Sequence, residues 1–146
     1  MAAAAAIVAF LGGLVVGGRL RVMDAHDAPI EQERFVLLLY ESEEYANATT
    51  PDAEVARVHE YGEWAGNTAR SGRFVTGEKL AYDGRWCRMR GDALETAPPI
   101  ADAVRGTLAG YFIIGAASYD DAVAITRDCP HLKYGGSIEV RRIEPT

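Results

Sequence analysis

The sequence predicts an α+β fold in which helices cover one face of an antiparallel sheet. An apolar run at residues 34–40 precedes a long helical pattern over residues 50–72, and residues 108–145 predict a strand, a helix and a strand. Between these segments, alternating residues around a tight turn predict a hairpin. The expected order of strand, long helix, strand, hairpin, strand, helix and strand fits a split β-α-β arrangement.

The first strand is expected at residues 34–40, where the continuous apolar run predicts burial on both faces. The first helix then begins with Thr50 as its cap and Pro51 at its first position, and it ends at Gly72. It is expected to pack on the sheet through an apolar stripe of residues at helical spacing, namely Val55, Val58, Gly62, Ala65 and Ala69.

The middle of the chain predicts short strands joined by turns. A strand is expected at residues 73–77, and residues 86–90 and 93–96 are expected to be the two strands of the hairpin. The Pro-Pro pair that follows has no backbone donor at two successive positions, which predicts a bend. Residues 101–107 then form a short connection whose length allows a single helical turn.

The C-terminal part shows the clearest pattern. Residues 111–114 are apolar, aromatic or β-branched, as is typical of a buried strand. Ser118 followed by Asp121 predicts the start of a helix, and Pro130 is expected to end it because proline cannot donate to the helix ladder. Residues 137–143 alternate between apolar and polar side chains, which predicts a half-exposed strand.

The composition limits the classes of function. With 146 residues, the chain is expected to form one domain with a real core. Its net charge of −6 argues against a nucleic-acid partner. Cys87 and Cys129 lack metal-ligand spacing, so we expect buried structural thiols, with no metal site and no cofactor.

The N-terminal segment leaves three alternatives open. Residues 2–18 form an uncharged run near the lower limit of roughly 17 residues for crossing a bilayer. If Met23 is the true start, the segment is translated upstream sequence. The other two alternatives are a membrane anchor and a cleaved signal peptide. We therefore divide the chain into a leader with a linker (residues 1–32) and one domain (residues 33–146). The domain is expected in the cytoplasm, or held there by the anchor.

Several of the predicted strands carry apolar residues on both faces, and the helices are expected to cover only one face of the sheet. The other face then needs a partner. The simplest partner is a second copy of the chain in a two-fold homodimer.

The segments between about residues 34 and 145 also resemble a known family. The most specific motifs are Cys129-Pro130-His131 and Ile138-Glu139-Val140-Arg141, and the hairpin residues 87–96 add to them. On these residues the chain resembles the YCII-related family, and specifically its DGPF branch. The resemblance implies a ferredoxin-like fold, usually dimeric, with a small pocket between sheet and helices. One relative of similar fold is a dehydrochlorinase acting on a chlorinated hydroquinone, with a His/Asp pair proposed for proton transfer.

The chain departs from the family pattern at two places. The Asp-Gly-Pro-Phe-Ala-Glu segment of the branch is replaced by residues 97–102, so its Asp is missing and its Glu has become Asp102. The family's usual catalytic candidate is a histidine on the first helix. Ungapped alignment brings Tyr61 nearest to that position, and His59 reaches it only with a shift.

His59 is the leading catalytic candidate because an unperturbed histidine pKa of about 6.5 suits acid/base work near neutral pH. Glu63 lies one helical turn away and could orient it. Glu78, at the end of a strand, could supply a carboxylate. The structural alternatives are an exposed helix residue for His59, paired loosely with Glu63, and a turn residue for Glu78.

Tyr61, Trp64 and His131 are the expected ligand-pocket residues. The two aromatic residues could form one wall of an apolar pocket, or could belong to the core or to a dimer interface. His131 precedes the last strand, in a loop where a structural role is the alternative.

Two hypotheses of function follow. The first is a small dimeric enzyme that performs proton transfer, as elimination or isomerisation, on a small molecule. The second is a non-catalytic module that binds a ligand or a protein, linked to transcriptional regulation because DGPF-like proteins resemble components found with sigma factors. A pocket-facing His59 with a nearby carboxylate favours the enzyme, and a solvent-facing His59 favours the module.

Overall fold

The computed structural model describes residues 32–42, 50–102 and 104–145. The chain forms a four-stranded antiparallel sheet in the order β2-β5-β1-β6 and a separate two-stranded hairpin, β3-β4. The α+β class is therefore confirmed. The strands are β1 (Glu33–Glu41), β2 (Phe74–Lys79), β3 (Trp86–Arg90), β4 (Ala93–Ala97), β5 (Thr107–Ala116) and β6 (Ser137–Arg142), and the helices are α2 (Pro51–Arg70), α3 (Tyr119–Thr126) and α4 (Pro130–Lys133).

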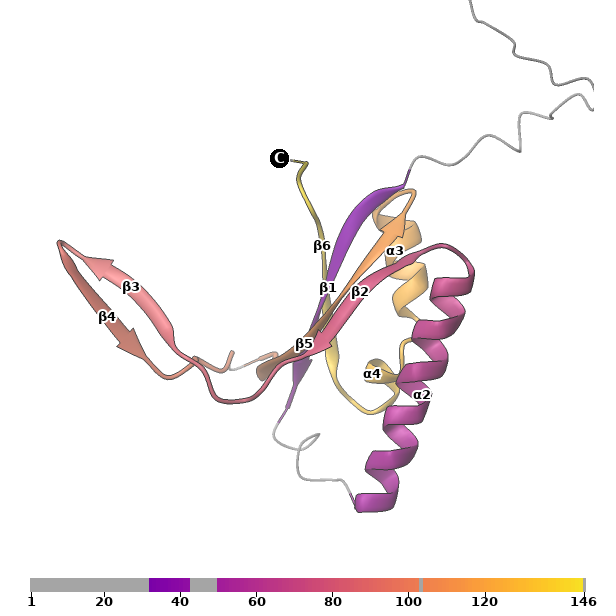
Figure 1. Cartoon of the computed structure of the whole chain (residues 1–146), viewed down its shortest axis with the longest axis horizontal. Coiled ribbons are helices and arrows are strands. Elements are labelled where there is room, and N and C mark those ends of the chain that lie inside the picture. The colour runs from indigo at the N-terminus through magenta and orange to yellow at the C-terminus, as the bar shows by residue number, and fades with distance from the viewer. Residues whose placement is uncertain (1–31, 43–49, 103, 146) are drawn as a thin grey trace, which may run out of the picture.

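The connections form two interleaved split units. The first unit consists of β1, α2 and β2, and β5 lies between its two strands in the sheet. The second unit consists of β5, the two short helices and β6, and β1 lies between its two strands. The three helices of the described residues lie on the same face of the sheet (Figure 1). None of these helices covers the opposite face, which we call the open face.

The core lies between the sheet and these helices. Phe35, Leu37 and Leu39 are buried, whereas Val36 and Leu38 are only half-buried. In the single chain this strand is buried on the helix-covered face only, because alternate residues of a strand point to opposite faces. Burial of its other face stays a prediction.

α2 begins as predicted, with the Ala53 amide donating to the Thr50 hydroxyl at 3.3 Å, but its buried face differs from the predicted stripe. Val55 and Val58 are mostly exposed, and Trp64 and Thr68 are the buried residues. The large indole of Trp64 packs on Phe112 with ring centroids 5.0 Å apart. Burying this ring removes more apolar surface from water than burying valine or alanine, so it sets the rotation of the helix.

Three local predictions near the C-terminal half are also corrected. α3 ends at Thr126, before Pro130, and Pro130 begins α4 because the first turn of a helix needs no donor at that position. The described residues between 101 and 107 form no helix, and Asp102 and Gly106 pair as an isolated bridge. Cys129 is buried, but Cys87 is exposed.

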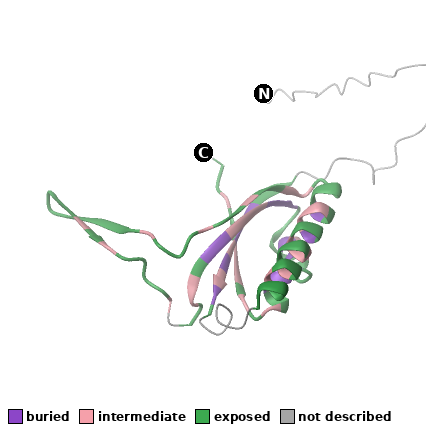
Figure 2. Cartoon of the chain, turned by 60° about the horizontal axis from the view of Figure 1, so that its bottom comes forward, coloured by how far each residue is buried: buried purple, intermediate pink, exposed green. Residues whose placement is uncertain are grey.

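The hairpin forms where the sequence predicts it and extends away from the sheet and its helices (Figure 1). Its residues are almost all exposed or half-exposed, as Figure 2 shows along both of its strands. The predicted leader up to residue 31 lies outside the described residues. No helix in the described part of the chain is both long and apolar enough to cross a membrane.

Candidate functional site

A pocket of about 250 Å³ lies between α2 and the helix-covered face of the sheet. Its apolar wall includes Leu39, Val58, Ala109 and Phe112. A second hollow of about 310 Å³ adjoins it and shares four charged residues with it. The polar and charged residues that line the two hollows are Glu41, Thr50, Glu54, Arg57, Tyr61, Glu78, Lys79, Tyr82, Tyr111 and His131.

Tyr61 and His131 form a hydrogen-bonded pair in the wall of this pocket. Tyr61 comes from the middle of α2 and His131 from α4, and the Tyr61 hydroxyl oxygen lies 2.8 Å from His131 Nδ1. The other ring nitrogen, Nε2, lies 2.9 Å from the Tyr40 carbonyl oxygen at the end of β1. A carbonyl can only accept, so Nε2 carries the hydrogen, Nδ1 accepts, and the Tyr61 hydroxyl donates.

The turn after α4 makes room for the imidazole. A Cβ atom on Gly136 would lie only 2.3 Å from His131 Nε2 and 2.5 Å from its Cδ2, so a larger residue would collide with the ring. The Gly136 amide also donates to the His131 carbonyl at 3.0 Å. The glycine therefore lets the chain fold back over a histidine that is only 1% exposed.

Burial lowers the pKa of His131 below its ordinary value of 6.5. The hydrogen bond to Tyr40 and the nearby Glu41 carboxylate partly oppose this shift, because both favour the charged imidazole. At neutral pH the ring is thus neutral, with a lone pair on Nδ1 directed at the Tyr61 hydroxyl. This arrangement can accept a proton from Tyr61 when the phenol gives one up.

The mouth of the pocket is charged. Arg57 Nη1 and Lys79 Nζ lie 3.6 Å and 3.8 Å from the two carboxylate oxygens of Glu54. The Arg57 guanidinium also lies over the Tyr134 ring, 4.8 Å from its centroid. In the adjoining hollow, the Tyr82 hydroxyl donates to the buried Glu41 carboxylate. The pocket therefore offers an apolar interior and an entrance with both signs of charge.

The sequence-predicted catalytic residues are not brought together. His59 Nδ1 lies 3.8 Å from Glu63, but the two side chains are 73% and 63% exposed and neither residue lines the pocket. Glu78 is among the residues that line the pocket. In the pairing of β2 with β5, however, Glu78 lies opposite Tyr111, and this pair alternates along the strands with the pair Gly77 and Phe112. Its side chain therefore points to the open face of the sheet.

Of the predicted pocket residues, Tyr61 and His131 line the pocket, and Trp64 packs in the core instead. Sequence reasoning missed Arg57 and the Tyr40 carbonyl. Arg57 lies four residues before Tyr61 and shares its helix face, so its spacing carried a usable signal. A backbone carbonyl has no residue-type signature, so nothing in the sequence could have indicated Tyr40.

The family model for the YCII-related domain matches residues 34–146, which is most of the chain. The chain belongs to the YCII-related family. No curated protein matches it. The family assignment predicted from the sequence is confirmed, and the narrower DGPF branch stays a prediction.

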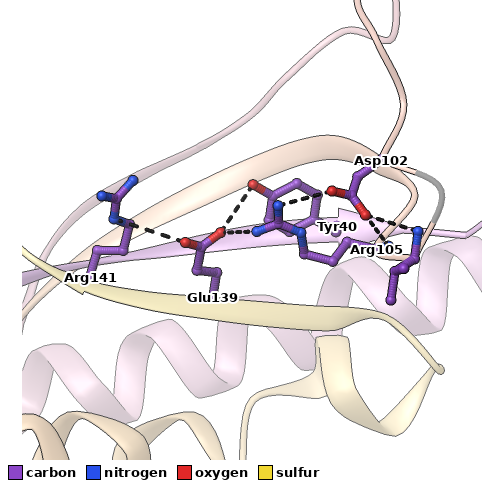
Figure 3. A network of polar contacts seen from close by, with 6 residues as sticks. Tyr40, Asp102, Arg105, Glu139 and Arg141 are labelled. Atoms are coloured by element: carbon purple, nitrogen blue, oxygen red, sulfur yellow. Dashed lines mark hydrogen bonds and ion pairs between the residues drawn. The ribbon is translucent and has the colours of Figure 1, made fainter.

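This YCII-related domain carries a second polar cluster, on the open side of the sheet (Figure 3). Asp102 accepts hydrogen bonds from the Val104 and Arg105 amides at 2.9 Å, and its carboxylate pairs with the Arg105 guanidinium at 2.9 Å. Arg105 in turn donates to Glu139, which also accepts from the Tyr40 hydroxyl at 3.4 Å.

These contacts fasten the segment before β5 to strands β1 and β6. The hydrogen bonds from the Arg105 guanidinium and from the Arg105 and Val104 amides lower the pKa of Asp102 to about 2. Asp102 therefore has a structural role in this chain. In the described part of the domain, no three His, Cys, Asp or Glu side chains gather as a metal site would require. That no cofactor is needed stays a prediction.

Proposed function

We propose that this YCII-related domain is an enzyme that moves protons on a small molecule, with Tyr61 as the acid/base group and His131 as its proton acceptor. The observation that supports the proposal most directly is the hydrogen bond from the Tyr61 hydroxyl to a buried, neutral His131 in the pocket wall. A free tyrosine is almost entirely protonated at neutral pH, because its pKa is about 10, so little phenolate is available to act as a base. An acceptor for the hydroxyl hydrogen, such as His131 Nδ1, lets the phenolate form during the reaction.

The proposed reaction keeps the proton balance within the pair. As Tyr61 passes its proton to His131 Nδ1, the phenolate takes a proton from a carbon of the ligand. Isomerisation follows when Tyr61 returns that proton to another atom of the ligand and His131 restores the phenol. Elimination shares the first step, after which a leaving group departs as an anion; Tyr61 keeps the proton taken from carbon and His131 releases its proton to solvent, which restores both groups.

Two neighbours stabilise the imidazolium that forms during transfer. The Tyr40 carbonyl accepts the Nε2 hydrogen at 2.9 Å, and the Glu41 carboxylate acts through its charge. Both interactions are stronger with the charged ring than with the neutral one, so they lower the energy of the proton-transfer state relative to the resting state.

The pocket also indicates the shape of the ligand. Its apolar wall would take a ring or short hydrocarbon portion, and the charged mouth would face a polar end of the molecule. With a volume of about 250 Å³ the first hollow suits a small molecule rather than a peptide.

The test is solvent deuterium exchange into bound ligands. Small carbonyl and aromatic compounds are screened for binding by ligand-observed NMR, and each binder is then followed for deuterium incorporation at carbon in D₂O. The wild type is expected to catalyse exchange. Tyr61→Phe keeps the ring and removes the hydroxyl, so exchange should fall by about 100-fold or more while binding persists. His59→Ala is the matched control and should exchange as the wild type does.

Exchange that survives Tyr61→Phe, or that is lost in His59→Ala, would refute the assignment. Binding without exchange in the wild type would instead support the second function, a non-catalytic ligand-binding module. One observation favours that alternative. The side chains of His59 and Glu63 face solvent, and a solvent-facing His59 is the feature that favours a non-catalytic module.

A further inference from the structure

Arg57 is the charged group held most firmly where the two hollows meet. It lines both hollows, and its side chain is only 12% exposed. Its guanidinium lies over the Tyr134 ring, 4.8 Å from the ring centroid. An arginine stacked on an aromatic ring has less freedom to move, and its planar fork then loses little further entropy when it binds a ligand.

The charged neighbours Glu54 and Lys79 are held less firmly. Their side chains are 43% and 67% exposed. The Glu54 carboxylate lies 3.6 Å from Arg57 Nη1 and 3.8 Å from Lys79 Nζ, and both distances exceed those of a hydrogen bond. Exposed ion pairs of this kind contribute little to stability, because solvent screens them. An anionic group of a ligand can therefore replace Glu54 beside the two cations.

The other acids among the described lining residues are placed differently. Glu41 is buried, accepts a hydrogen bond from the Tyr82 hydroxyl and acts through its charge on the His131 imidazole. Glu78 points to the open face of the sheet, as its pairing register requires. Glu54 is thus the acid that shares the exposed mouth with Arg57 and Lys79. This arrangement favours a ligand that carries a negative charge.

Arg57 also lies one helical turn before Tyr61 on α2. Side chains four residues apart share a helix face, with Cβ atoms about 5–6 Å apart. A ligand group held by Arg57 therefore brings the carbon atoms next to it to the Tyr61 hydroxyl. The apolar wall, with Leu39 and Phe112, is left for the rest of the molecule.

We propose that Arg57 binds a carboxylate of the ligand, so that the ligands of this pocket are small carboxylic acids with an apolar ring or short chain. A guanidinium has five N–H donors, so it can hold a carboxylate through two parallel hydrogen bonds and keep its contacts with the protein. Lys79 adds a second positive charge from β2. The inference rests on the proposed function for the reaction that the bound acid undergoes, and it names the class of molecule.

The test compares three probes that share one ring and differ in charge: benzoate, benzamide and benzylamine. Their binding to the full chain is titrated at pH 7 by ligand-observed NMR. Benzoate is expected to bind about 10-fold or more tightly than benzamide, and benzylamine more weakly still. Inorganic phosphate at the same concentration should not displace benzoate, because it lacks an apolar part. Equal binding of benzoate and benzamide, tighter binding of benzylamine, or displacement by phosphate would overturn the proposal.

Arg57→Met removes the charge and keeps an unbranched apolar side chain. It is expected to weaken benzoate binding by about 10-fold or more and to leave benzamide binding within about 2-fold of the wild type. The matched control is Arg70→Met, because Arg70 is exposed in the last turn of the same helix, roughly 20 Å along its axis from Arg57. This control should bind both probes as the wild type does. Unchanged benzoate binding in Arg57→Met, or an equal loss in Arg70→Met, would contradict the assignment.

Arg57→Lys decides the case in which the methionine variant loses both probes or fails to fold by circular dichroism. Lysine keeps the charge and loses the planar fork. Benzoate binding should then fall by more than benzamide binding, and an equal fall of both would overturn the proposal.

The benzoate titration is also independent of the proposed chemistry. Benzoate carries no hydrogen on the carbon next to its carboxylate, so its binding requires no proton transfer. Selective benzoate binding without deuterium exchange into any ligand would refute the proton-transfer function and leave the carboxylate site in place. Exchange into neutral carbonyl compounds that is unchanged in Arg57→Met and shows no preference for acids would do the reverse, and would overturn the carboxylate site.

Discussion

At the residue scale, the proposed chemistry depends on a histidine made neutral by burial and on the tyrosine that donates to it. The sequence indicated Tyr61 and His131 as pocket residues, but their pairing joins positions 70 residues apart and could not be seen in any local pattern. The preference for His59 over Tyr61 rested on residue type alone. The structure favours Tyr61 instead, because His59 lies on the solvent side of α2, away from the pocket.

Gly136 is predicted to be essential for seating His131. A methyl group in Gly136→Ala would meet the ring at 2.3 to 2.7 Å, so the ring must move and the bond to Tyr61 is lost. We expect the free energy of unfolding to fall by about 1–3 kcal/mol, as for overpacked cores. Urea denaturation measures it.

Gly62→Ala is the matched control for this glycine substitution. Gly62 lies in the middle of α2 and a Cβ there would meet nothing within 4 Å. Replacing it should raise stability by about 0.5–1 kcal/mol, since alanine favours the helix. Equal stability of the two variants would contradict the proposed packing of Gly136 on His131.

At the element scale, periodicity and capping signals predicted most of the fold. The alternating strands, the hairpin and the Thr50 start of α2 were all predicted, because each depends on neighbouring residues. The buried face of α2 was not predicted. Two faces of this helix carry apolar residues, a stripe of valine, glycine and alanine on one and a single tryptophan on the other, and the tryptophan packs against Phe112. The role of Pro130 also depends on context, since proline suits both the end of one helix and the start of the next.

The start of α3 is predicted to depend on Asp121. Its carboxylate accepts from Arg73 Nη1 at 2.6 Å and from the Ala117 amide at 2.9 Å, which ties β2 to the helix. These bonds lower the pKa of Asp121. Asp121→Asn should reduce stability by about 1–2 kcal/mol at pH 7 in urea denaturation.

The pH dependence of this effect has a definite sign. Because the folded pKa of Asp121 lies below the model value of 3.8, its stabilisation is present above that value and is lost as the pH falls through the folded pKa. The difference between Asp121→Asn and the wild type should therefore shrink near pH 3. Asp120→Asn, an exposed neighbour, should stay within about 0.5 kcal/mol of the wild type. A constant difference at all pH values would contradict the charge-based explanation.

At the scale of the whole molecule, one face of the sheet carries the helices and the pocket, and no helix of the described residues covers the other. The sequence predicted that the helices cover only one face; that a second copy covers the other stays a prediction. The sequence could not show that the hairpin leaves the domain on the open side, because the direction of such a hairpin depends on the twist and packing of the strands that precede it.

The stability of the whole domain should respond to the buried His131. In the unfolded chain this histidine takes up a proton near pH 6.5, whereas the folded state resists protonation until a lower pH. The unfolded state thus binds more protons in this window, so the free energy of unfolding falls as the pH drops below about 6.5, with a slope of at most about 1.4 kcal/mol per pH unit. Urea denaturation between pH 7.5 and 5.5 measures the slope. His59→Ala should keep it, and a stability that is flat or rises toward pH 5.5 would count against a buried, neutral His131.

The most direct test of the central claim is an NMR titration of the His131 imidazole in ¹⁵N-labelled protein. We expect a neutral ring with the hydrogen on Nε2, a pKa below 6.5, and a change in the Nδ1 chemical shift in Tyr61→Phe, where the donated hydrogen bond is absent. A ring that titrates near 6.5 with its hydrogen on Nδ1, unaffected by Tyr61→Phe, would mean that the tyrosine does not donate to the histidine and that the pocket lacks the proposed proton-transfer pair.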